Sequence, residues 1–83
     1  MDYEFVLSLA ANLEEHGATK QAERLYLTVL KEVEEIYGPL SPMAGKVILQ
    51  LIDFYDREGR EVESNDLMKR IHPIADQILK GEP

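Results

Sequence analysis

The 83-residue sequence contains no cysteine and no tryptophan. The lack of cysteine excludes disulfide bonds and thiolate metal sites. The first residues, MDYEFVLSLAANLEEHG, carry acids in place of a basic start, and polar residues interrupt their apolar positions. They therefore form neither a signal peptide nor a membrane span. We expect a cytoplasmic protein without a membrane partner.

Basic residues are also scarce. Nine Lys and Arg residues stand against sixteen Asp and Glu residues, which gives a net charge of −7. Residues 1–42 hold eight acids and three bases, while residues 43–83 hold eight acids and six bases. Nucleic-acid binding needs clustered Lys and Arg, so we expect no nucleic-acid partner. The acidity suits a protein or peptide with basic flanks, but solubility alone is a sufficient reason for it.

Glycine and proline are few, and Gly17, Gly38, Pro39, Pro42 and Gly59 lie where helices should begin or end. Apolar residues recur at intervals of three and four, which predicts helices at about residues 3–16 and 19–37 and two more after Ser41 and Gly59. No window alternates with period two, so we expect no strand. The predicted buried stripes are Phe5, Val6, Leu9, Ala10 and Leu13; Ala22, Leu25, Tyr26, Val29, Leu30, Val33 and Ile36; Val47, Ile48, Leu51, Ile52 and Tyr55; and Val62, Leu67, Met68, Ile71, Ala75 and Ile78.

Pro73 conflicts with the last of these stripes. A proline in a helix interior removes an amide donor and costs about 3 kcal/mol. Either the helix kinks at Pro73 or it breaks near His72. The apolar spacing continues through Ile74 and Ile78, which favours a kink.

The two halves of the chain match when they are offset by 42 residues. Gly17 then meets Gly59, Leu7 meets Leu49, and the helix starts coincide. Generic amphipathic helices would not align both glycines and both starts. We therefore predict one all-α domain over residues 1–83, built from two antiparallel helix–turn–helix repeats (about 1–41 and 42–80) and a short tail, 81–83.

Within each copy, the residues follow a recognisable order of large and small side chains. They are Val6, Leu9-Ala10, Leu13, Gly17 and Ala22 in the first copy, and Ile48, Leu51-Ile52, Tyr55, Gly59 and Ser64 in the second. This order resembles the tetratricopeptide repeat, and the longer period is similar to that of kinesin-light-chain repeats. The resemblance implies a right-handed superhelical stack and a non-enzymatic scaffold that binds a peptide or helix on its concave face.

That concave face would be formed mainly by the first helix of each repeat. The residues predicted to line it are Glu4, Leu7, Ser8, Ala11 and Glu14 from the first copy and Lys46, Leu49, Gln50, Asp53 and Asp56 from the second. Leu7 and Leu49 have two interpretations: ordinary packing residues, or an apolar floor rimmed by carboxylates.

Two repeats give only two layers, whereas such arrays usually need three or more with polar ends. We therefore expect apolar surface at Ile74 and Leu79 and at the Tyr3–Phe5 end. Another copy, in a homodimer, or a larger partner would cover that surface.

Little in the sequence indicates a catalytic activity. An alternative is a four-helix phosphotransfer or regulatory domain acting through an exposed histidine, with His16 and Lys20 as its only support. Gly17 would end the helix that such a site needs. We expect no catalytic residue, metal site or cofactor.

Overall fold

The computed structural model describes residues 1–81, which fold into four helices. They are α1 (Tyr3–Glu15), α2 (Thr19–Tyr37), α3 (Pro42–Arg57) and α4 (Glu61–Lys80). No strand occurs in these 81 residues, so the predicted all-α class is confirmed. Of the predicted tail, residues 82 and 83 lie outside the described part of the chain. None of the four helices is both long and apolar enough to cross a membrane.

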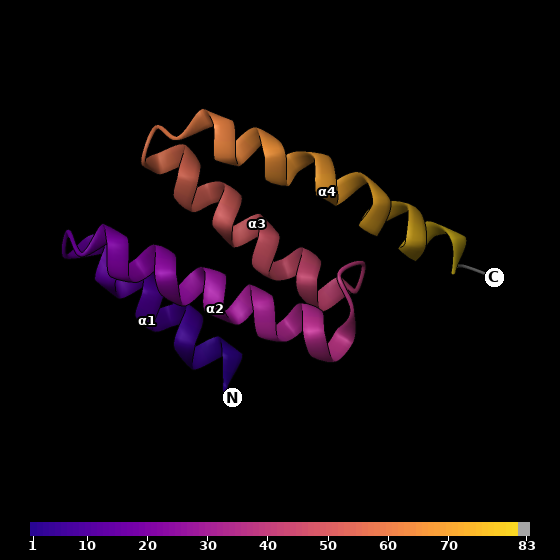
Figure 1. Ribbon diagram of the computed structural model, residues 1–83, viewed down its shortest axis with the longest axis horizontal. Helices are drawn as coiled ribbons and strands as arrows, with labels where there is room; N and C mark the ends of the chain where they lie inside the picture. The colour runs from indigo at the N-terminus through magenta and orange to yellow at the C-terminus, as the bar shows by residue number, and fades with distance from the viewer. Residues whose placement is uncertain (82–83) are drawn as a thin grey trace.

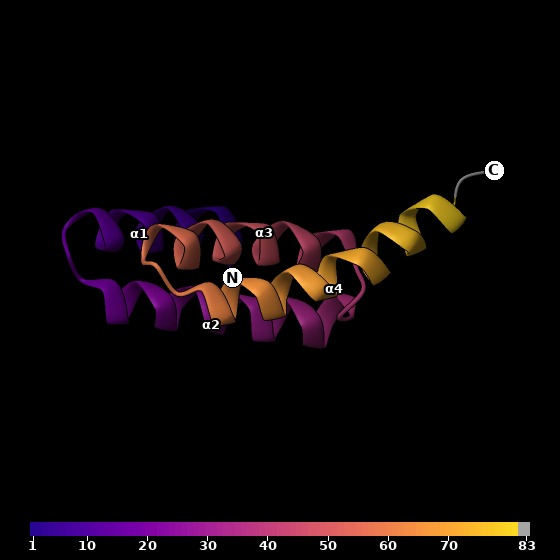
Figure 2. The same cartoon turned by 90° about the horizontal axis from the view of Figure 1, so that it is seen from above.

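Consecutive helices run antiparallel and pack side by side (Figure 1). Seen from above, α1 and α3 form one layer, and α2 and α4 form the other (Figure 2). Within the described residues α1 and α4 do not pack against each other, so the molecule is an open stack of two hairpins and not a closed bundle. We call α1 and α2 the first hairpin, and α3 and α4 the second. The right-handed superhelical sense stays a prediction.

The turns inside the two hairpins have the same backbone structure. Gly17 and Gly59 both have a positive φ, 83° and 72°, which glycine adopts without steric cost. In each turn the amide after the glycine donates to the carbonyl five residues earlier, at 2.8 Å: Ala18 to Leu13, and Arg60 to Tyr55. This is the Schellman ending of a helix. The offset of 42 residues is therefore present in the hydrogen bonding as well as in the sequence.

The starts of α1 and α3 are capped by side chains. The Asp2 carboxylate accepts from the amide of Phe5 at 3.1 Å, and the Ser41 hydroxyl accepts from that of Ala44 at 3.1 Å. Pro42 follows Ser41 in the first turn, where its missing amide is no loss. The helix predicted after Ser41 therefore begins at its predicted position.

The buried stripe of α1 agrees only in part with the predicted one: Ala10 is buried and Val6 and Leu13 pack against the core. Phe5 and Leu9 are 63% and 41% exposed, while Leu7 is buried next to Ala10. The cause is that, among the helices of residues 1–81, α1 packs closely on α2 alone, so the side chains on its opposite side are left uncovered. Periodicity identifies a stripe, but its orientation is set by the partners.

On α4 the prediction fails in the same way. Val62, Met68, Ala75 and Ile78 were expected inside but are exposed, as is Ile36 at the end of α2. Only one helix, α3, packs on α4.

Ile74 was expected to be partly exposed and is buried. It is buried because Gly45 on α3 has no side chain: a Cβ placed there would lie 3.2 Å from Cγ2 of Ile74. The exposed Leu79 agrees with the prediction. Helix α4 continues through Pro73 without a break, and it changes direction in its C-terminal half (Figure 2), as the predicted kink requires.

The core is centred on α3. Phe54 is fully buried, and its ring centroid lies 5.4 Å from that of Tyr26 on α2. Sequence reasoning did not single out Phe54, because its counterpart in the first copy is the polar Asn12.

We predict that Phe54→Ala lowers the free energy of unfolding by about 3–5 kcal/mol, because it empties the contact between the hairpins. The exposed Phe5 gives a matched control, and Phe5→Ala should change stability by no more than about 0.5 kcal/mol. Urea denaturation at micromolar protein concentration measures both. Equal losses would show that the hairpin contact is not the centre of the core.

Candidate functional site

The ten residues predicted to line a concave face lie on α1 and α3, which share one layer (Figure 2). The two leucines differ sharply: Leu7 is 4% exposed and belongs to the core, whereas Leu49 is 53% exposed. The predicted apolar floor made by both leucines is therefore wrong. The others are exposed or partly exposed side chains on these two helices: Glu4, Ser8, Ala11, Glu14, Lys46, Gln50, Asp53 and Asp56.

The predicted carboxylate rim mostly has partners within the chain. Glu14 accepts two hydrogen bonds from the Arg57 guanidinium, at 2.9 and 2.7 Å, and these bonds hold the pKa of Glu14 below its usual range. Glu4 pairs with Lys46. Asp56 accepts from the hydroxyl of the buried Ser64 at 2.6 Å. These contacts join the helices of the molecule to one another.

The ion pairs between the hairpins follow one rule. In every such pair of residues 1–81, the carboxylate belongs to the first hairpin and the cation to the second. The pairs are Glu4–Lys46, Glu14–Arg57, Glu23–Arg60 and Glu34–Arg70. The first half of the sequence, which is the more acidic, thus supplies the carboxylates of the ion pairs between the hairpins, and the second half supplies the cations.

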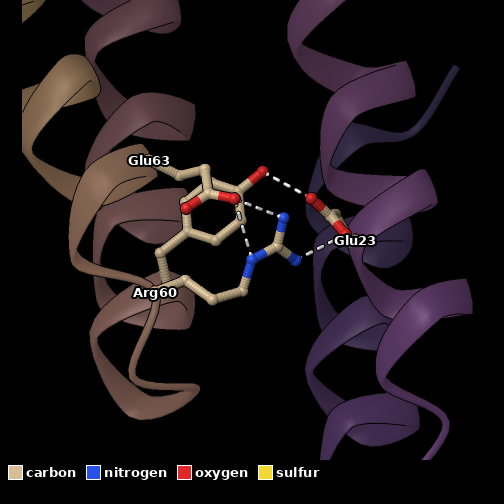
Figure 3. Close-up of polar contacts among 4 residues, drawn as sticks. Glu23, Arg60 and Glu63 are labelled. Carbon is tan, nitrogen blue, oxygen red and sulfur yellow. Dashed lines mark hydrogen bonds and ion pairs between the residues drawn. The ribbon is translucent and has the colours of Figure 1, made fainter.

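Arg60 is the centre of a polar cluster that joins α2, α3 and α4 (Figure 3). Its guanidinium donates to Glu23 at 2.8 Å and to Glu63 at 3.0 and 2.7 Å, and lies 4.8 Å from the ring centroid of Tyr55. The Tyr55 hydroxyl donates to Glu23 at 2.7 Å. Burial and the Glu23 carboxylate raise the pKa of Tyr55, while Arg60 lowers the pKa of Glu23. The cluster fixes the start of α4 against the first hairpin.

An apolar groove runs between α3 and α4, on the face of the second hairpin that no described helix covers. Its central part has a volume of about 510 Å³. We call this feature the groove. It is lined by Pro42, Gly45, Lys46, Leu49, Gln50, Met68, Lys69, Ile71, His72, Ile74, Ala75 and Ile78. Three of the ten predicted binding residues, Lys46, Leu49 and Gln50, are among them.

The repeat explains the groove. Leu49 and Met68 occupy the positions of Leu7 and Tyr26 in the first hairpin, which are buried there. What covers Tyr26 is α3, through Phe54. The groove is therefore the surface of the second hairpin that corresponds to the surface of the first hairpin on which α3 packs.

Sequence reasoning placed the predicted binding face on α1 and α3 and did not identify the groove, one side of which is formed by α4. A signal was available: the apolar stripe of the last helix had no further helix to cover it. Comparing matched positions, such as Val33 with Ala75, would have located the groove.

The histidine alternative has a different geometry. His16 is exposed at the end of α1, and its Nδ1 lies 2.8 Å from the carbonyl oxygen of Asn12, to which it donates. Within residues 1–81, no group of three His, Asp or Glu side chains has a metal-binding arrangement.

Comparison with known proteins gives no match: no protein-family model, no curated protein and no solved structure is similar to this chain. The likeness to tetratricopeptide repeats rests on the residues of the chain alone.

The polar contacts predict loss of stability in acid. Because the folded-state pKa values of Glu14 and Glu23 lie below the unfolded value of about 4.3, protonation favours the unfolded chain. The stabilisation is complete above that value and is lost as the pH falls through the folded pKa. Glu23→Gln should cost about 1 kcal/mol at pH 7 and flatten this dependence.

Urea denaturation at pH 7, 5, 4 and 3 measures the effect. The exposed Glu35 provides the control, since Glu35→Gln should leave the pH dependence unchanged. Parallel pH curves for wild type and Glu23→Gln would show that the Arg60 cluster does not stabilise the fold.

Proposed function

We propose that this chain is a non-enzymatic protein-interaction module that accepts an amphipathic helix in the groove between α3 and α4. One observation carries the proposal: the same repeat position is buried in the first hairpin, at Leu7, and exposed in the second, at Leu49. The first hairpin shows what fits such a surface, because α3 lies on it.

The groove has the physical properties of a helix-binding site. Recognition of a helix in a groove uses apolar anchors spaced by three and four residues. Covering a large apolar side chain contributes about 1.5–3 kcal/mol, and Leu49, Met68 and Ile78 are each about half exposed. The walls are held in place by Ile74 packed on Gly45, so binding does not have to order the groove.

The polar part of the predicted binding face contributes to the rim. Gln50 and Lys46 line the groove beside Leu49. Ser8 and Asp53 are exposed on the same layer of helices. In this proposal they contact the ends or the outer side of a bound helix, and the apolar groove supplies most of the affinity.

A peptide of residues 42–57 tests the proposal, since it is α3 itself. Lys46 of the peptide is replaced by Gln, so that it does not bring a lysine to the lysine of the groove. We expect Leu49→Glu in the full chain to weaken peptide binding by about tenfold or more, which is about 1.4 kcal/mol. Isothermal titration calorimetry measures it.

Leu27→Glu is the matched control, because Leu27 is also part-exposed but lies on α2, outside the groove. It should bind the peptide as wild type does. Circular dichroism establishes that both variants are folded. If Leu49→Glu and wild type bind the peptide equally, or if wild type does not bind it, the groove is not the site.

A further inference from the structure

The exposed side of α1 is the surface that would fit the groove. Phe5 and Leu9 are exposed there, whereas Val47 and Leu51, at the same positions of α3, are fully buried. Positions that are exposed on α1 and buried on α3 are those that contact a preceding hairpin. We call Phe5, Leu9 and Asn12 the head face.

We propose that the occupant of the groove is α1 of a second copy, so that copies associate head to tail. This inference rests on the proposed function of the groove and names its partner. The second hairpin of one copy and the first hairpin of its partner would then repeat the contact that joins the two hairpins within the chain. Phe5 and Leu9 would lie over Leu49 and Met68, as Val47 and Leu51 lie on the first hairpin.

Charge at one point of this contact is complementary. Within the chain, Glu4 pairs with Lys46. Between copies, Lys46 beside the groove would stand where Glu4 stands on the first hairpin, and Glu4 of the second copy would stand where Lys46 stands on α3. An ion pair would then form between these two residues again, with the two charges exchanged between the surfaces. Lys46 has three donors, and its side chain is half exposed, so it can serve both carboxylates.

Two positions make the contact between copies weaker than the one inside the chain. Asn12 stands where α3 has Phe54, and a polar amide does not fill the space beside Met68. Glu15 of the second copy stands where α3 has Arg57, and it would face Asp56, the counterpart of Glu14. Two carboxylates would therefore meet where the chain itself has an ion pair. Association is therefore expected at high protein concentration, after each chain has folded by itself.

The symmetry of the contact has a consequence that separates it from an ordinary dimer. A head face and a groove are different surfaces, so the contact is heterologous and leaves one free head and one free groove on every assembly. The mean size of the assemblies then increases with concentration and does not stop at two copies.

Two blocked variants test the proposal. Phe5→Glu/Leu9→Glu blocks the head, and Leu49→Glu/Met68→Glu blocks the groove; all four side chains are exposed. At ~100 μM in sedimentation equilibrium, each variant alone should be a monomer. An equimolar mixture should form a one-to-one complex and nothing larger, because one free groove meets one free head.

The other outcomes overturn the proposal. A mixture that stays monomeric while wild type associates, or a wild type that stops at a dimer, requires a symmetric contact. If the wild type is monomeric at this concentration, the proposed head-to-tail association does not occur. In each case, binding of the residue 42–57 peptide decides separately whether the groove is a helix site, since the head-blocked variant keeps its groove.

A strengthening variant adds a second readout. Asn12→Phe gives α1 the aromatic side chain that α3 has, and it should tighten association of wild-type grooves by about tenfold. Asn65→Phe is the matched control on α4, at an exposed asparagine outside the groove. If both variants tighten association equally, or if Asn12→Phe has no effect, α1 does not sit in the groove as α3 sits on the first hairpin.

Discussion

The packing of α3 on the first hairpin is the contact on which the rest of the molecule depends. Helix α3 packs on α2 and on α4, it has more buried side chains than any other helix of residues 1–81, and these include Phe54 against Tyr26. A chain of this size has a small core, and neither hairpin has one of its own that is closed on both sides. Both hairpins contribute side chains to one shared core.

The ion pairs around this contact set its register more than its strength. Partly exposed pairs contribute about 0–1 kcal/mol each. Their arrangement, with all four carboxylates on the first hairpin, is satisfied only when the second hairpin lies at one position along the first. Arg60 adds direction, because its hydrogen bond to Glu23 and its contact with Tyr55 place the start of α4.

Most of the fold could be predicted from the sequence because its determinants are local. Gly17, Gly59 and Ser41 define turns and caps within a few residues, and the 42-residue offset aligns corresponding positions of the two hairpins. The orientation of the stripes could not be predicted in this way. Whether Leu7 or Leu9 faces the core depends on where the second hairpin lies, and the burial of Ile74 depends on Gly45, on another helix. The site shares this limit: Lys46, Leu49 and Gln50 were found on α3, but the half of the groove on α4 required the packing.

In the head-to-tail association proposed above, the two hairpins would make the same kind of contact twice, once within the chain and once between copies. The differences between the copies then determine the order of events. Phe54 and Arg57 are on α3, where they meet Tyr26 and Glu14, whereas α1 has Asn12 and Glu15 at these positions. The intramolecular contact therefore has the larger apolar side chain and the better charge, and it also has the high effective concentration of a tethered segment. A sequence with Phe at both positions would let foreign hairpins compete with its own during folding. In that proposal, keeping the stronger contact inside the chain would let the second hairpin close on the first before either surface meets another copy.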